Sequence, residues 1–338
     1  MPLLDYTHRI ISRESLSSED ARAAMAIILR GEANVAQVAS FLVALRMKGE
    51  TAEELQGLAE AMRDSMIRVD TQVRNEPLLD TCGTGGDGHG TLNVSTLAAL
   101  VVAGAGVKVA KHGNRAVSSS FGSGDLLEAL GARLDLTPEQ LGRAVREIGF
   151  AFLFAPSHHP AMRHAGPARA ELKMRTVFNL LGPLANPAGA SHQLIGAPSV
   201  EAAELMANAL ACLGSERAFV VHGEDGLDEV TTTGATAVFE VGQNSVNRFE
   251  WRPSDFGVAP ARASDLEGGD RTRNCEIAMS VLTGERGARR DIVLVNAAAA
   301  LVAAGAAADT RAGMLRAAES IDSGAARLKL KALAEFSG

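Results

Sequence analysis

The stretch DTCGTGGDGHGT, residues 80–91, sets the interpretation of the chain around it. It follows a short apolar run that begins at Leu78, and helix-forming residues follow it from Asn93 onward. Five of the eight residues from Gly83 to Gly90 are glycine, which lets backbone N–H groups approach a ligand closely. A glycine loop that leads from a strand into a helix N-terminus favours an anion. The stretch therefore predicts a strand, an anion-binding loop and a helix.

Outward from this loop, short apolar runs alternate with helical stretches. We expect strands at residues 78–80, 107–110, 150–154, 193–196, 218–222 and 237–241. Helices are expected between them, for example at residues 126–131, 139–148 and 201–213. This alternation is typical of an α/β fold with a mostly parallel central sheet. A polar, helical insertion at residues 157–186 interrupts it and ends in a Gly-Pro-Leu-Ala-Asn-Pro turn.

Residues 12–68 have a different pattern, of three successive helices and no strand. The helices follow the capping residues Ser17, Asn34 and Thr51, and each carries apolar residues at helical spacing. We therefore predict a small helical domain over residues 1–72, joined by the insertion at about 160–186. A larger α/β domain is predicted over residues 73–338.

The composition excludes several classes of protein. Of the 338 residues, 46% are hydrophobic and 22% are charged, which rules out wholesale disorder. The net charge of −7 disfavours a nucleic-acid-binding protein. The longest apolar run, residues 292–308, is mostly alanine and contains Asn296 and Gly305, so we expect a buried helix and no membrane span. Neither nucleic acid nor a membrane is expected as a partner.

The cysteines and the N-terminus indicate the compartment. Cys82, Cys212 and Cys275 are far apart and form no CxxC pair, which fits a reducing environment and argues against disulfides and zinc. The first ten residues lack the charged-then-apolar layout of a signal peptide. We therefore predict a cytoplasmic protein.

The glycine loop fits neither of the two common nucleotide motifs. Gly83, Gly85 and Gly88 match GxGxxG, but that fingerprint expects an acidic residue about 20 positions later to hold a ribose. After Gly88 the first acidic residue is Asp125. A Walker A loop fails as well, because His89 follows Gly88 where that motif has lysine. These mismatches weaken a dinucleotide-dependent oxidoreductase as an alternative.

Basic residues follow instead of acidic ones. The segment from Gly88 to Gly124 contains Lys108, Lys111 and Arg115 and no acid. KHGNRAVSS, residues 111–119, comes directly after the second predicted strand, so its loop and the glycine loop should face one crevice at the carboxyl edge of the sheet. Hydroxyl groups are added by Ser118, Ser119, Ser120 and Ser123. The crevice is predicted to bind a polyanion with more than one phosphate.

An acidic turn follows a later strand. HGEDGLDE, residues 222–229, ends in the adjacent carboxylates Asp228 and Glu229, which suit Mg²⁺ bound together with substrate phosphates. A solvated acidic turn is the alternative. In the insertion, Arg169, Lys173 and Arg175 are basic, and an arginine has the fork geometry for a carboxylate.

Several motifs together resemble the anthranilate phosphoribosyltransferases of tryptophan biosynthesis. They are ALRMKG (44–49), GTGGD (83–87), NVST (93–96), KHGNRAVS (111–118), HPAM (159–162), RTVFNLLGPL (175–184) and the pair Asp228–Glu229. The resemblance extends from about residue 16 to residue 304. Phe121 and Gly124 depart from it, since we would expect a small or polar residue and an alanine there.

The resemblance implies a fold and a reaction. The fold is a helical domain plus an α/β domain, similar to that of the pyrimidine nucleoside phosphorylases, in a homodimer formed through the helical part. The reaction joins anthranilate to the ribose of phosphoribosyl pyrophosphate (PRPP) and releases pyrophosphate, with Mg²⁺ as cofactor, two ions per subunit being expected.

The resemblance also implies roles for individual residues. Ser95, Asp228 and Glu229 would bind magnesium. Gly83, Asn114 and Arg169 would bind anthranilate, with His112 and His159 along its access path. PRPP would be held by Gly83, Gly86, Asp87, Thr91, Asn93, Val94, Ser95, Thr96, Lys111, His112, Gly113, Asn114, Arg115, Ala116, Val117, Ser118, Ser119 and Ser123.

Two alternatives share the fold but not the function. A pyrimidine nucleoside phosphorylase would carry different residues around the glycine loop and would lack the acidic pair for magnesium. A nucleic-acid-binding relative would have a basic surface and degraded substrate motifs, which the net charge of −7 and the intact 111–119 motif oppose.

Overall fold

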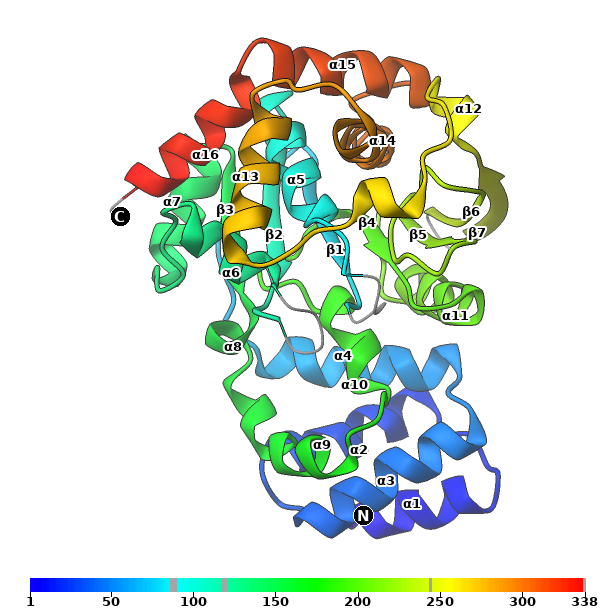
Figure 1. The fold of residues 1–338 in the computed structure, drawn as a ribbon. Coiled ribbons are helices and arrows are strands. Elements are labelled where there is room, and N and C mark those ends of the chain that lie inside the picture. The colour runs from blue at the N-terminus through cyan, green and yellow to red at the C-terminus, as the bar shows by residue number, and fades with distance from the viewer. Residues whose placement is uncertain (86–89, 117–120, 243–244, 337–338) are drawn as a thin grey trace.

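The computed structural model describes residues 1–85, 90–116, 121–242 and 245–336. It has a small helical part and a larger α/β part, as predicted (Figure 1). The helical part begins with α1 (Leu3–Ile11), α2 (Ser18–Leu29), α3 (Val35–Lys48) and α4 (Ala52–Ser65). The side chains of Ser17, Asn34 and Thr51 each accept a backbone N–H of the helix that follows, so all three predicted caps are confirmed.

One sheet forms the centre of the α/β part. Its strands are β1 (Leu78–Gly83), β2 (Lys108–Gly113), β3 (Phe150–Phe154), β4 (His192–Gly196), β5 (Arg217–Gly223), β6 (Thr236–Gly242) and β7 (Ser245–Trp251). Their order is β3-β2-β1-β4-β5-β6-β7, and the first five in that order are parallel. β6 and β7 pair antiparallel at one edge. The predicted mostly parallel sheet is confirmed.

The two faces of the sheet bury different helices. Leu194 and Phe219 pack into a core with α5 (Val94–Gly104) and α14 (Ala288–Ala303). Their strand neighbours Ile195 and Val220 point the other way, into a core shared with α11 (Val200–Cys212) and the helical part. The other α-helices of the α/β part are α6 (Ser123–Ala129), α7 (Pro138–Glu147), α12 (Pro253–Phe256), α13 (Arg271–Leu282), α15 (Thr310–Asp322) and α16 (Ala325–Glu335).

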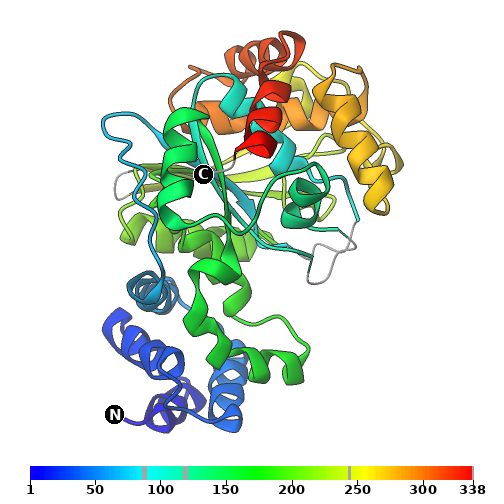
Figure 2. The ribbon, with the colours of Figure 1, turned by 90° about the vertical axis from the view of Figure 1, so that its left-hand side faces the viewer.

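The insertion joins the helical part, as Figures 1 and 2 show. It begins within α8 (Ala155–His158), which directly follows β3. A 3₁₀ turn at Pro160–His164, α9 (Gly166–Leu172), α10 (Phe178–Leu181) and a second 3₁₀ turn at Gly182–Leu184 come next. Arg63 of α4 donates a hydrogen bond of 2.7 Å to the carbonyl oxygen of Leu184. The helical part is therefore built from two segments that lie far apart in the sequence.

The long apolar run forms a buried helix, as predicted. Every residue from Ile292 to Ala303 is at most 6% exposed in α14. No helix within the described part of the chain is long and apolar enough to cross a membrane.

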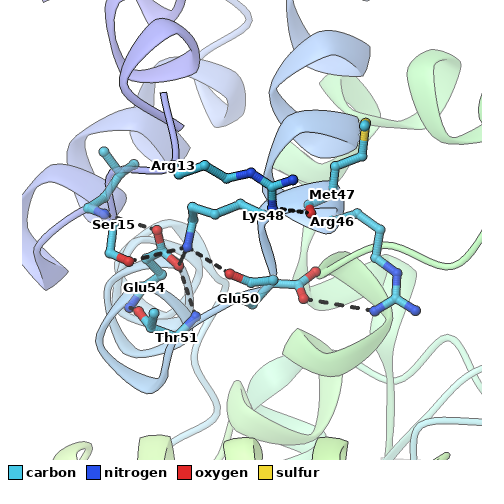
Figure 3. A network of polar contacts seen from close by, with 10 residues as sticks. Arg13, Ser15, Arg46, Met47, Lys48, Glu50, Thr51 and Glu54 are labelled. Atoms are coloured by element: carbon cyan, nitrogen blue, oxygen red, sulfur yellow. Dashed lines mark hydrogen bonds and ion pairs between the residues drawn. The ribbon is translucent and has the colours of Figure 1, made fainter. Parts of the chain in front are cut away.

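A buried ion pair ties the helical part together (Figure 3). Lys48 Nζ at the end of α3 lies 2.9 Å from Glu54 Oε2 in α4, and the Glu54 side chain is fully buried. The same carboxylate accepts the backbone N–H of Leu16 at 2.9 Å and that of Thr51 at 2.8 Å. Glu54 thus closes the capping box of α4 and holds the α1–α2 connection against it.

We expect Glu54→Gln to lower the free energy of unfolding by about 3–5 kcal/mol, because it leaves the Lys48 ammonium buried without its anion. Urea unfolding followed by circular dichroism measures this change. The neighbouring Glu53→Gln, at an exposed position of the same first turn, is the control and should change stability by less than about 0.5 kcal/mol. Equal losses in both variants would contradict the prediction.

Candidate functional site

The candidate site lies at the carboxyl edge of the sheet, where the strand order reverses. From β1 the chain moves outward through β2 to β3, and then returns to pair β4 on the other side of β1. Ligands of open α/β sheets bind at such a switch point. Gly83 pairs with Gly196 there, so the ends of β1 and β4 are level. The loops after β1, β2 and β5 all reach this edge.

Two glycines make room for the acidic turn. A Cβ at Gly83 would lie 2.6 Å from the Oδ2 of Asp228, and one at Gly196 would overlap the carbonyl oxygen of Asp228. The same Oδ2 accepts the backbone N–H of Gly85 at 2.9 Å. Asp228 is therefore fixed against the described start of the glycine loop.

The second carboxylate of the pair caps a helix. Glu229 Oε1 accepts the N–H of Ser95, in the first turn of α5, at 3.1 Å. A negative charge is favourable at a helix N-terminus, where N–H groups lack partners within the helix. Asp228 and Glu229, which the sequence predicts as metal ligands, thus contact the described start of the glycine loop and the first turn of α5.

Lys111 reaches the same place from β2. Its ammonium donates to the carbonyl oxygen of Thr81 and lies 3.3 Å from the hydroxyl of Ser95. The side chain is almost fully buried, and this burial lowers the pKa of Lys111, while Asp80, Glu229 and Asp228 act to raise it. Lys111 thus brings its side-chain nitrogen to the first turn of α5.

Hydrogen bonds connect the start of α5 with the segment that follows β2. The Thr96 hydroxyl donates to the Ser123 hydroxyl at 2.9 Å, and Asn93 Nδ2 donates to the carbonyl oxygen of Phe121 at 3.0 Å. Gly124 N donates to the carbonyl oxygen of Asn114 at 3.0 Å. The structure therefore brings Asn93, Ser95, Thr96, Lys111, Asn114 and Ser123 into one region.

Two basic residues of the segment from Gly88 to Gly124 are engaged by other partners. Lys108 begins β2, at the opposite edge of the sheet, and donates to the carbonyl oxygen of Arg146 at 2.9 Å. Arg115 is exposed and pairs with Glu128 at 2.7 Å and with Asp125 at 3.1 Å. Its guanidinium is engaged by these acids of α6 in this structure.

The other predicted residues are placed as follows. Thr91 forms an isolated β-bridge with Glu267, and the N–H of Ala116 donates to Asp125 at 2.9 Å. Val94 begins α5, and Gly113 ends β2 against the Phe152 ring. Gly86, Asp87, Val117, Ser118 and Ser119 lie outside the described residues.

A fully buried carboxylate anchors β1 to β2 and to the insertion. Asp80 accepts the backbone N–H of His112 at 3.0 Å and the Asn186 side-chain amide at 2.8 Å. The same amide also donates to the carbonyl oxygen of Ala110 at 2.8 Å. Burial raises the pKa of Asp80, against the effect of Lys111 and of these hydrogen bonds. Asp80 and Asn186 were not predicted, because only the fold brings positions so far apart together.

Two buried histidines lie side by side near the site. The rings of His112 and His159 are 5.1 Å apart. His112 Nδ1 lies 3.1 Å from the carbonyl oxygen of Gly182, so it carries the proton, and its buried Nε2 has no partner among the described residues. Burial is the main reason why the pKa of His112 falls to about 3 and that of His159 to about 4.

These histidines predict a loss of stability in acid. In the unfolded chain both histidines have the ordinary pKa of 6.5. In the folded protein the pKa is about 3 for His112 and about 4 for His159. Their contribution is complete above pH 6.5 and falls as the pH drops toward those folded values, with a slope of about 1.4 kcal/mol per pH unit for each histidine.

Urea unfolding at several pH values tests this window. His159→Gln removes one of the two protons taken up on unfolding. Below about pH 6.5 the slope of the unfolding free energy against pH should therefore fall by about 1.4 kcal/mol per pH unit. The exposed His8→Gln is the control and should leave the slope unchanged. An unaltered slope in His159→Gln would show that the acid sensitivity has another origin.

Arg169 in α9 is the predicted carboxylate-binding residue. It is half-buried, burial lowers its pKa, and its guanidinium carbon lies 5.5 Å from the centre of the Phe178 ring. Within the described ranges its guanidinium forms no hydrogen bond or ion pair. Nearby in the sequence, Arg175 Nη2 lies 3.4 Å from the Thr84 hydroxyl, which links the insertion to the glycine loop.

Comparison with known proteins agrees with this geometry. Residues 75–327 match the family described as "Glycosyl transferase family, a/b domain", and residues 4–66 match its helical bundle domain. The chain is 61% identical over 336 residues to the anthranilate phosphoribosyltransferase of Solibacter usitatus, covering 99% of both chains.

Two solved structures are similar throughout. The crystal structure of anthranilate phosphoribosyltransferase from Thermus thermophilus is 46% identical, with a TM-score of 0.92 and 98% of each chain covered. The Saccharomyces cerevisiae enzyme, solved in complex with PRPP and Mg, is 33% identical, with a TM-score of 0.89, covering 99% of this chain and 97% of that one. The chain belongs to the anthranilate phosphoribosyltransferase family.

Proposed function

We propose that this chain transfers the phosphoribosyl group of PRPP to the amine of anthranilate, a step of tryptophan biosynthesis. The bond from the ribose C1 to pyrophosphate breaks, the bond from C1 to the aryl nitrogen forms, and the nitrogen loses a proton. An aryl amine is already unprotonated near pH 7 and needs no strong base. The protein's task is therefore to position the substrates and to stabilise the charge of the leaving pyrophosphate.

One observation supports this assignment most directly. The N–H groups that would receive phosphate oxygens at Gly85 and Ser95 are held by Asp228 and Glu229. If a polyanion takes these donors, the two carboxylates need a cation between themselves and the phosphates. The site is thus suited to a polyanion and a cation that bind together.

The donor set fits magnesium. Asp228, Glu229 and the Ser95 hydroxyl offer only oxygen atoms, which Mg²⁺ prefers. Among the described residues no three His, Cys, Asp or Glu side chains form a metal cluster, and an ion shared with substrate phosphates needs none. When bound, Mg²⁺ would neutralise the charge of the leaving pyrophosphate. We infer two ions per subunit.

For PRPP we propose the residues implied by the motifs. Lys111 and the N-terminus of α5 would hold the pyrophosphate, because both carry positive charge at the switch point. Asn93 and Thr96 and the loop from Lys111 to Ser123 would hold the rest. Arg115 would join them only after leaving Glu128 and Asp125.

For anthranilate we propose Arg169, with Gly83 and Asn114. The fork of Arg169 suits the carboxylate and has no competing anion within the described part of the chain. His112 and His159 stay neutral near pH 7, so they would neither trap nor repel an anion along its path.

The oligomeric state, the domain limits and the cellular location are proposed as well. We propose a homodimer formed through the helical part, where α2 lines surface hollows of about 440 and 520 Å³. The domain limits at residues 1–72, with the insertion at about 160–186, and 73–338 also remain proposals. A cytoplasmic location fits the separated cysteines.

The test follows the fluorescence of anthranilate mixed with purified protein, PRPP and Mg²⁺, with and without EDTA. We expect a loss that requires both PRPP and the metal. No loss with folded protein would reject the assignment, and nucleosides with phosphate would then be tried.

A further inference from the structure

Asn296 is a polar residue in the middle of an apolar helix. It is fully buried in α14, and its neighbours Val295 and Ala297 are fully buried as well. Asparagine is a poorer helix former than leucine or alanine, and a buried amide is costly unless it is hydrogen-bonded. Asn296 belongs to none of the motifs on which the predicted site rests.

The Asn296 side chain forms hydrogen bonds with both backbone polar groups of one residue, Val230. Its Oδ1 accepts the N–H of Val230 at 2.9 Å, and its Nδ2 donates to the carbonyl oxygen of Val230 at 2.9 Å. Nδ2 also donates to the carbonyl oxygen of Ile292, one turn earlier in the helix, at 2.9 Å. The amide therefore pairs with Val230 as a neighbouring strand would.

Val230 directly follows the acidic pair. Asp228 and Glu229 are held on one side by the N–H groups of Gly85 and Ser95. On the other side, Asn296 fixes the peptide groups on both sides of Val230, and so the direction in which Glu229 leaves the chain. The pair is held between the glycine loop and α14.

We propose that Asn296 is a positioning residue that sets the geometry of the metal-binding carboxylates Asp228 and Glu229. The proposal rests on the magnesium site of the proposed function. Asn296 itself would contact neither the substrate nor the metal. It acts through the Val230 backbone, which would otherwise carry a buried N–H and carbonyl without partners.

The experiment measures metal binding without turnover. Binding of Mn²⁺, as a paramagnetic substitute for Mg²⁺, is titrated in the presence of PRPP and without anthranilate, and free Mn²⁺ is read by electron paramagnetic resonance. Asn296→Leu keeps a similar volume and removes both bonds to Val230. We expect its Mn²⁺ dissociation constant to rise by about 10–100-fold, as for other residues that orient metal ligands.

The control is Leu301→Ala in the same helix, at a fully buried position that makes no polar contact with the turn. It should destabilise the fold and leave the Mn²⁺ dissociation constant within about twofold. Hydrogen exchange of residues 228–230 gives a second readout, which should speed up in Asn296→Leu and not in the control. Asn296→Ser, whose hydroxyl is too short to reach both groups of Val230, serves if the leucine variant does not fold.

The outcomes separate the two proposals. A dissociation constant within twofold of the parent protein's in either folded Asn296 variant would overturn the positioning role. Equal weakening in Leu301→Ala would also overturn it, because the effect would then be one of general stability. If the parent protein itself binds no Mn²⁺ with PRPP, the magnesium assignment fails first.

Discussion

Asp228→Asn should lower kcat/KM for PRPP by about 10²–10³-fold, the loss typical of removing one group that stabilises developing charge. Asparagine keeps an oxygen that can accept the N–H of Gly85, so the loop geometry survives. The negative charge is lost, and with it the attraction for a cation beside the phosphates. The Mg²⁺ concentration needed for half-maximal rate should rise in parallel, and initial rates over a range of Mg²⁺ and PRPP concentrations measure both effects.

The control for this prediction lies in the same turn. Glu224 is exposed and its Oε2 accepts the N–H of Ala235 at 3.2 Å, away from the glycine loop. Glu224→Gln should change kcat/KM by less than about twofold, since a surface charge contributes little. If Asp228→Asn retained full activity at low Mg²⁺, the carboxylate would have no role in cation binding.

Arg169→Ala should raise the KM for anthranilate by about 10–150-fold, because a hydrogen bond to a charged group contributes about 1.5–3 kcal/mol. The KM for PRPP should change by less than about threefold. Arg169→Lys should recover part of the loss, since lysine keeps the charge and loses the fork. Steady-state rates with each substrate varied in turn separate the two constants.

Arg163→Ala is the matched control for Arg169→Ala. Arg163 is an exposed arginine of the same insertion. Its removal should leave both constants within about twofold. Equal increases in the two KM values of Arg169→Ala would show that the residue supports the shape of the insertion and does not bind anthranilate.

Much of the fold followed from local patterns. The caps of α2, α3 and α4 and six of the seven strands were predictable, because capping residues and buried apolar runs are local signals. β7 was missed. It is an edge strand whose sequence SVNRFEW is largely exposed and includes Arg248 and Glu250, so no apolar run marks it. α1 was missed because Pro2 precedes it without a side-chain cap.

The site was predictable only where sequence order fixes position. Loops after parallel strands must meet, so the glycine loop and the loop after Lys111 could be brought together from sequence. The second strand extends to Gly113, beyond its predicted end at residue 110, so Lys111 lies in the strand and not in the loop after it. The bonds of Asn186 and Asn296 depend on the fold. Their only local signal is a polar residue in buried surroundings.

Because the helical part is built from two distant segments, it cannot complete its core while the first segment is being synthesised. α1 to α4 are made first, yet their shared core also contains Phe178 and Leu181 of α10 and Met206 and Leu210 of α11. At about 5–20 residues per second, the nascent helices wait roughly 7–30 s until α11 is complete. During that interval the apolar surfaces that α10 and α11 later cover are open to solvent. Chaperone binding to ribosome-bound chains should therefore be strongest before α11 is complete.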